Sequence, residues 1–305
     1  MTYYHPEAQI LELEEIARQL RIESIHMIYR RQAGHPGGSL SAAEIIAALY
    51  FYKLRVDPAR PDWPDRDRMI MSKGHASAVL YAALARRGFF PSEDLTHWGE
   101  LACHLQGHPD RLKTPGVDMT AGLLGHGIPV GIGLALAARL RNAAYRTYVV
   151  LGDGECQAGV VWEGAMAAAK FGLANLTAIL DYNDVQLDGP VHEIMPLEPL
   201  ADKWRSFNWN VLEINGHDMH QVLEALDLAD ETHSRPTIVI AHTTKGKGVS
   251  YMENKAEWHG AAPNEAQYRQ ALEELRSPPA KSARSPAPLA GGLRAPSAGG
   301  RTKDG

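Results

Sequence analysis

The stretch LGDGECQAGVVWEGAMAAAKFGLANLTAILDYNDVQLDG, residues 151–189, decides the fold. An apolar run ends in Gly152-Asp153-Gly154, an alanine-rich segment typical of a helix follows, and a second apolar run precedes Asn183. This order predicts a strand, a helix and a second, parallel strand. Because the carboxyl ends of parallel strands meet at one edge of a sheet, we expect Asp153 and Asn183 at the edge where ligands of open α/β sheets bind.

The residues at these two strand ends suit a divalent cation held against a diphosphate. A carboxylate, an amide oxygen and nearby backbone carbonyls are the oxygen ligands that Mg²⁺ or Ca²⁺ prefers. Gly152 and Gly154 let the backbone approach phosphate oxygens closely, and the next helix presents its N-terminus to them. The competing interpretation is an ordinary strand–helix–strand unit in which Asp153 and Asn183 only cap helices or turns.

The rest of the chain alternates strand and helix patterns, which predicts an α/β fold, a doubly wound parallel sheet with helices on both faces. Apolar spacing predicts a helix over residues 7–32, and Ser41 with Glu44 predicts a capping box for the next helix. Further strands are expected at 68–71, 210–214 and 237–241, further helices at 75–87, 123–140 and 219–229, and loops at 56–67 and over most of 92–119.

Composition narrows the functional class. The chain has 305 residues, 45% of them hydrophobic, and a net charge of −5, which gives no electrostatic basis for binding nucleic acid or an anionic membrane. The N-terminus lacks the pattern of a signal peptide, and no apolar run approaches the roughly 20 residues that span a bilayer. Two cysteines suit a reducing compartment, so we expect a cytoplasmic protein.

Further motifs place histidine beside glycine where a helix or strand pattern breaks. They are Gly34-His35-Pro36-Gly37-Gly38, Ser72-Lys73-Gly74-His75-Ala76, Gly107-His108-Pro109 ahead of Ala121-Gly122-Leu123-Leu124-Gly125-His126-Gly127, and Trp258-His259-Gly260. Any one of these histidines alone is more typical of a turn than of a catalyst. Together, and in this order around the GDG turn, the motifs resemble the N-terminal half of transketolases, which are thiamine-diphosphate enzymes. The resemblance covers roughly residues 10 to 275.

The resemblance implies a role for each matching residue. Asp153, Asn183 and the carbonyl of Val185 match metal ligands for Mg²⁺ (or Ca²⁺), and Gly154 matches a glycine that contacts the diphosphate of thiamine diphosphate. The residues that match cofactor contacts are His75, Gly122, Leu124, Gly154, Glu163, Asn183 and His259. Gly122 and Leu124 would flank the aminopyrimidine ring, and Glu163 would join a carboxylate network across a dimer interface.

The resemblance also makes the four histidines the catalytic set, namely His35, His75, His108 and His259. His75 would lie near the diphosphate and the reacting carbon, and the others would bond donor hydroxyls or move protons at the substrate carbonyl. Histidine suits this work because its ordinary pKa lies near neutrality.

Four positions depart from the family pattern. Ala158 stands where a glutamate is usual, so one carboxylate of the interface network is missing, and His126 stands where glutamine is frequent. Lys245 and Lys247 make the turn at 244–248 more basic than the family's apolar one. We interpret the two lysines as a solvated turn rather than as contacts to a phosphate or sulfonate of the substrate.

The resemblance predicts that this chain is half of an enzyme. Full transketolases continue into a pyrimidine-binding domain, whose glutamate bonds the aminopyrimidine ring. We therefore expect one cofactor-binding domain at residues 1–276, a disordered Pro/Ala/Gly-rich tail at 277–305, and a partner, the C-terminal transketolase subunit with the pyrimidine-binding domain. Two copies of each chain would form a heterotetramer in which the copies of this chain make a homodimer. Its substrates would be sugar phosphates.

Two alternatives stay open. One is the α subunit of the first component of a 2-oxoacid dehydrogenase, which is also split, but an oxoacid has no row of hydroxyls for several histidines to bond. The other is a non-catalytic orphan domain that binds the cofactor without turnover. Retention of every matching histidine and both side-chain metal ligands argues against that decay.

Overall fold

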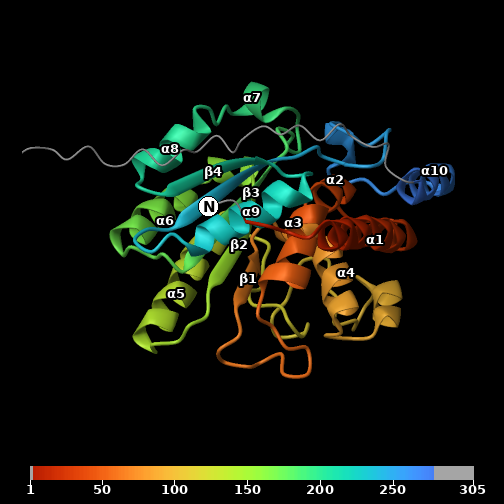
Figure 1. The fold of residues 1–305 in the computed structure, drawn as a ribbon. Helices are drawn as coiled ribbons and strands as arrows, with labels where there is room; N and C mark the ends of the chain where they lie inside the picture. Colours follow the sequence, from red (N-terminus) through yellow and green to blue (C-terminus); the bar gives the residue numbers. More distant parts are fainter. Residues whose placement is uncertain (1–2, 278–305) are drawn as a thin grey trace, which may run out of the picture.

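A parallel sheet lies at the centre of the protein (Figure 1). The computed structural model describes residues 3–277, so the predicted tail lies outside the described residues from position 278 onward. Within that range the sheet has five strands in the order β1-β2-β3-β5-β4. They are β1 (Arg68–Met71), β2 (Thr147–Gly152), β3 (Leu176–Tyr182), β4 (Asn210–Asn215) and β5 (Thr237–His242). Every neighbouring pair is parallel, which confirms the predicted fold.

Helices cover both faces of this sheet (Figure 1). On one side pack α1 (Glu7–Arg31), α3 (Ala43–Ala48), α4 (Ser77–Arg87) and α9 (Met219–Asp230); on the other pack α5 (Gly127–Leu140), α6 (Gly159–Lys170) and α8 (Leu200–Ser206). Successive side chains of a strand point to opposite sides of the sheet. Tyr148 and Val150 of β2 belong to the first core, and Val149 and Leu151 belong to the second. Burial on both faces explains why these strands read as continuous apolar runs.

The remaining helices and turns complete the fold. They are α2 (Pro36–Ser41), α7 (Val191–Ile194), α10 (Glu265–Arg276), the π-helix Leu49–Lys53, and the 3₁₀ turns Gly74–Ala76, Ser92–His97, Gly154–Gln157 and Ala256–Trp258. α10 packs against α1 and starts with a capping box between Asn264 and Gln267. No helix in the described residues is both long enough and apolar enough to cross a bilayer.

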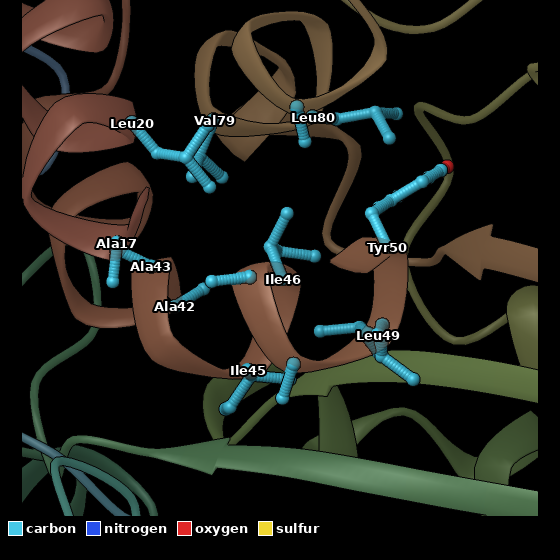
Figure 2. Close-up of a cluster of buried hydrophobic side chains, with 14 of the residues drawn as sticks. Ala17, Leu20, Ala42, Ala43, Ile45, Ile46, Leu49, Tyr50, Val79 and Leu80 are labelled. Carbon is cyan, nitrogen blue, oxygen red and sulfur yellow. The ribbon is translucent and has the colours of Figure 1, made fainter. Parts of the chain in front are cut away.

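The first core gathers between α1, α3 and α4 (Figure 2). Ile46 of α3 lies among Leu20 of α1 and Val79 and Leu80 of α4, and all four side chains are at most 2% exposed. Alanines at the start of α3 let its backbone approach α1 closely. α2 leads from the His35 motif into α3, and its Leu40 packs in a separate cluster with Ile25 of α1.

Two predictions about local structure were wrong. Ser41 and Glu44 form no capping box, because Ser41 bonds Asp181 and Glu44 pairs with Arg21 across the fold. The helix expected from residue 123 begins at Gly127, which leaves residues 121–126 as a loop. The capping box is absent because both side chains bond residues far away in the sequence. The helix starts at Gly127 because this residue lies against Ser72, directly after β1.

The backbone of α6 packs directly against side chains of α5 at Gly164. A Cβ atom at Gly164 of α6 would lie 2.6 Å from Cγ2 of Ile128 in α5, closer than packed atoms approach. By contrast, a Cβ atom at Gly133 of α5 would meet nothing within 4 Å. The packing of these two helices therefore requires glycine at position 164 but not at position 133.

We expect Gly164→Ala to lower the free energy of unfolding by about 1–3 kcal/mol, because the added methyl group overpacks the contact with Ile128. The control, Gly133→Ala, should be neutral or stabilise the chain by up to about 1 kcal/mol, since alanine favours the helix. Urea unfolding of both variants measures the difference. Equal stabilities for the two variants would contradict the close contact between the helices.

Candidate functional site

The carboxyl edge of the sheet brings the predicted metal ligands together. One carboxylate oxygen of Asp153, which follows β2, accepts hydrogen bonds from the backbone N–H groups of Asn183 (2.9 Å) and Asp184 (2.6 Å), which follow β3. The other oxygen accepts from the N–H of Gly154 at 2.7 Å. Asp153 and Asn183 are therefore direct neighbours, as the strand–helix–strand pattern predicted.

The Asp153 carboxylate is almost fully buried. Burial, with the nearby negative charge of Asp181, raises the pKa of Asp153 to about 6, although Lys245 and Lys73 oppose the shift. A buried carboxylate in this state gains from a cation brought next to it. The surroundings of Asp153 therefore favour a positively charged ligand.

Lys245 supplies a positive charge at this edge. Its side chain is buried, and its Nζ donates to the carbonyl oxygen of Val185 at 2.6 Å and lies 2.8 Å from Nδ1 of His259. Burial and the charge of Lys73 lower the pKa of Lys245 to about 8. The solvated turn expected for this lysine was wrong, whereas Lys247 is partly exposed, 3.6 Å from Glu253. A turn sequence alone gives no sign of which lysine points inward.

The four predicted histidines form one cluster. The ring of His35 lies 5.2 Å from that of His75, 6.2 Å from that of His108 and 5.5 Å from that of His259, and the rings of His75 and His259 stack 5.1 Å apart. Four separate segments contribute these rings, as the motifs predicted.

Burial keeps three of these rings uncharged. It lowers the pKa of His35 and moves that of His75 well below its ordinary value. Burial and the adjacent Lys245 lower the pKa of His259 to about 3. A neutral imidazole has one donor and one acceptor, so the cluster can both give and take hydrogen bonds from hydroxyl and carbonyl groups. His108 is the exposed member of the cluster.

A buried ion pair that the motifs did not reveal lies under the cluster. The Nζ atom of Lys73 donates to the carboxylate of Asp181, and also to the carbonyl of Gly38 at 3.1 Å. Ser41, at 2.6 Å, and Thr243 donate to the same carboxylate. Burial alone would raise the pKa of Asp181, but Lys73 and the two hydroxyls hold it below its ordinary value. The only sequence signal was a charged residue at the end of an apolar strand.

Glu155 is a second buried carboxylate that the sequence did not single out. It accepts from the Ser72 hydroxyl, from the N–H of Gly125 at 2.7 Å and from the N–H of Gly152 at 3.0 Å. Burial raises the pKa of this carboxyl, and the three hydrogen bonds oppose the shift. Its neighbour Cys156 is fully buried with its thiol facing the Gly152 carbonyl, so this cysteine is a packed side chain.

The remaining predicted residues lie at the surface of the chain. Gly122 is exposed, Leu124 is 39% exposed, and Glu163 is exposed on α6. His126, at the end of the same loop as Gly122, has its Nδ1 atom 3.3 Å from the carbonyl of Leu124. The cofactor and interface roles of these residues stay predictions, and their exposure leaves them available to a ligand or a second chain.

The oxygen atoms at this edge fit a hard cation. Asp153, the side chain of Asn183 and the carbonyl of Val185 are the type of oxygen ligand that Mg²⁺ and Ca²⁺ accept, and Mg²⁺ commonly takes phosphate oxygens as well. Within residues 3–277 no group of three or more His, Cys, Asp and Glu side chains has metal-binding geometry. A cation at this edge would depend on a diphosphate for further ligands.

Comparison with known proteins gives one consistent family. The family model described as the transketolase thiamine diphosphate binding domain matches residues 13–303. The chain is 42% identical over 269 residues to one of the subunits of apulose-4-phosphate transketolase from Phocaeicola vulgatus, covering 88% of this chain and 95% of that protein. It is 41% identical over 267 residues to the SqwG subunit of 6-deoxy-6-sulfo-D-fructose transketolase from a Clostridium species, covering 88% and 97%.

Solved structures agree with this family. Transketolase from Leishmania mexicana superposes with a TM-score of 0.82 at 31% identity, covering 86% of this chain and 41% of that one. Transketolase from Campylobacter jejuni gives a TM-score of 0.82 at 33% identity, covering 88% and 43%. The chain thus spans nearly the whole length of the two subunit relatives and less than half the length of these solved transketolases.

The buried ion pair under the site sets a stability prediction. We expect Lys73→Met or Asp181→Asn alone to lower the free energy of unfolding by about 3–5 kcal/mol, because each leaves an uncompensated group in the interior. The free energy of unfolding of the double variant should fall by much less than the sum of the two single losses. Urea unfolding of both singles and the double measures this coupling, with the exposed Lys113→Met as a control that stays near wild type. Additive losses would show that the two side chains do not interact.

Proposed function

This chain belongs to the transketolase family as its thiamine-diphosphate-binding domain, and from that premise we propose that it is the N-terminal subunit of a two-chain transketolase. The reaction would move a two-carbon ketol unit from a ketose phosphate to an aldose phosphate. The observation that carries the proposal is the four-histidine cluster beside Asp153 and Asn183 at one sheet edge. This arrangement places imidazole groups that can bond substrate hydroxyls next to the proposed site for the cation and the diphosphate.

We assign Asp153, Asn183 and the Val185 carbonyl to a divalent cation, Mg²⁺ or Ca²⁺, that holds the diphosphate. Thiamine diphosphate supplies the nucleophilic carbon that this chemistry needs. Lys245 donates to the Val185 carbonyl, so this carbonyl would hold a cation only if the ammonium bonded another acceptor. Diphosphate oxygens carry the charge that suits Lys245, and Gly154, which has no side chain, lets them approach the backbone.

The histidines would act on the substrate. We assign His75 to the diphosphate side, because it stacks on His259 next to buried Lys73. His35 and His259 are partly buried and uncharged, so each can take a proton as a base, and the imidazolium that forms can then give that proton to the substrate carbonyl. His108, the exposed member, is placed to bond a donor hydroxyl.

The partner follows from the subunit relatives. Both are named as transketolase subunits, and this chain covers at least 95% of each. We therefore propose a C-terminal subunit that carries the pyrimidine-binding domain and its glutamate, in a heterotetramer with two copies of each chain. The exposed Gly122, Leu124 and Glu163 would face the ring of the cofactor and a neighbouring chain. The free thiols Cys103 and Cys156 suit a cytoplasmic assembly.

We propose ketoses as the substrate class, without naming one sugar. The relatives are named for apulose 4-phosphate and for a sulfonated fructose, so both a phosphate and a sulfonate head group belong in the first substrate panel. Family membership favours ketol transfer over the 2-oxoacid dehydrogenase alternative. The orphan-domain alternative is decided by the assay that follows.

The proposed function predicts that the purified chain alone is inactive and becomes active with its partner, because the catalytic glutamate would come from the other subunit. The measurement is ketol transfer from a ketose phosphate to an aldose phosphate, with thiamine diphosphate and Mg²⁺ present, with and without the partner. Full turnover by the chain alone would overturn the split-enzyme proposal. Failure to bind any pyrimidine-domain subunit would support the orphan domain.

The metal assignment has its own test. We expect Asp153→Asn to weaken Mg²⁺-dependent binding of thiamine diphosphate by more than about a hundredfold, since the loss of a residue that only supports a metal ligand already costs up to that much. Calorimetry on the assembled complex measures the affinity, and circular dichroism checks the fold. The control is Asp188→Asn, an exposed aspartate on the loop after Val185. Unchanged affinity in the Asp153 variant would remove this residue from the metal site.

A further inference from the structure

Glu155 joins three segments that meet under the site. Its carboxylate accepts hydrogen bonds from the Ser72 hydroxyl after β1, the Gly152 N–H at the end of β2 (3.0 Å) and the Gly125 N–H before α5 (2.7 Å). All three partners are donors, and an ionised carboxylate is an acceptor only, so the match is complete. Glu155 is 3% exposed and is neither a metal ligand nor a member of the histidine cluster in our assignment.

Ser72 links Glu155 to the first residue of α5. Its hydroxyl donates to Glu155 and accepts from the N–H of Gly127, the first residue of α5, at 3.1 Å. A Cβ atom at Gly127 would lie 2.3 Å from Cβ of Ser72, so the start of α5 rests directly on this serine. The backbone at residues 125–127 is therefore fixed from two sides.

The loop before α5 has few other attachments. The N–H of Ala121 donates to the carbonyl of Pro109 at 2.9 Å, and the next fixed N–H is that of Gly125 on Glu155. Between them Gly122, Leu123 and Leu124 are exposed. The position of this stretch over the site thus depends on the hydrogen bond to Glu155 at its second end.

We propose that Glu155 is a positioning residue that fixes the distance between the two halves of the cofactor site. One half is the GDG turn with Asp153 and Gly154, and the other is the loop with Gly122 and Leu124. The assignment of these halves to the diphosphate and the aminopyrimidine ring rests on the proposed function. Glu155 lies beneath both segments and acts through their backbone N–H groups.

Both carboxylate oxygens of Glu155 are needed as acceptors, since one takes the Ser72 and Gly125 donors and the other takes the Gly152 donor. Glutamine at this position has one oxygen and one NH₂ group, so an NH₂ donor would face the N–H of Gly152 or Gly125. One of those buried donors would then lose its partner. A hydrogen bond to a charged group contributes on the order of a tenfold to hundredfold change in an equilibrium.

The first experiment measures the loop directly, by hydrogen exchange on the full chain without cofactor. In Glu155→Gln we expect the amides of residues 121–127 to exchange at least about tenfold faster, with β4 and α9 unchanged. The control is Glu12→Gln, an exposed glutamate on α1. Unchanged exchange at 121–127, or faster exchange throughout the chain, would overturn the proposal.

The second experiment separates the two halves of the cofactor. Calorimetry on the assembled complex compares thiamine diphosphate with inorganic pyrophosphate, each with Mg²⁺, because pyrophosphate reaches only the GDG half. We expect Glu155→Gln to weaken thiamine diphosphate about tenfold more than pyrophosphate, the change that one hydrogen bond to a charged group makes. Ser72→Ala should also weaken thiamine diphosphate more than pyrophosphate, but by a smaller factor. Glu155→Asp should bind thiamine diphosphate more tightly than Glu155→Gln does.

The outcomes separate this inference from the proposed function. Wild-type protein that binds neither ligand would contradict the proposed function. Equal weakening of both ligands would mean that Glu155 supports the GDG turn alone and would overturn the inference. If Glu155→Gln does not fold, Ser72→Ala decides, because it removes one hydroxyl and leaves the carboxylate with both backbone donors.

Discussion

The arrangement of the whole carboxyl edge depends on the buried ion pair of Lys73 and Asp181. Neither side chain is more than 1% exposed, and a buried charge of this kind is tolerated only when every polar group around it is satisfied. The pair therefore constrains its neighbours. The Gly38 carbonyl and the Ser41 hydroxyl bring in α2, and the Thr243 hydroxyl brings in the end of β5. Each of these segments stands next to one that carries a histidine or an oxygen of the proposed cation site.

The sequence predicted the framework because the framework follows from local patterns and one topological rule. Apolar runs marked the strands, and the parallel arrangement then required Asp153 and Asn183 to meet. The common site of the four histidine-containing motifs was implied by the resemblance to transketolases, since only His75 closely follows a strand and His35 stands before α2. Where boundaries were wrong, as at the start of α5, the deciding contact was with Ser72, far away in the sequence.

What the sequence did not reveal is which charged side chains are buried. Lys245 looked like a solvated turn residue, Glu155 was passed over, and Ser41 with Glu44 looked like a helix cap. In each case the deciding partner lies far along the chain: Val185, Gly125, Asp181 and Arg21, respectively. A charged residue in a turn is ordinarily exposed, so its burial becomes visible only when the distant acceptor is known.

The close seating of α5 has a consequence for motion. Added Cβ atoms would lie 2.3 Å from Ser72 at Gly127 and 2.7 Å from Val149 at Gly131, so at these two glycines the helix backbone rests directly on side chains of the sheet. Interiors packed at this density transmit displacement rather than absorb it. We therefore expect α5 to follow any displacement of the sheet. The exposed residues 122–124, which lie ahead of the Gly125 hydrogen bond to Glu155, are free of this constraint.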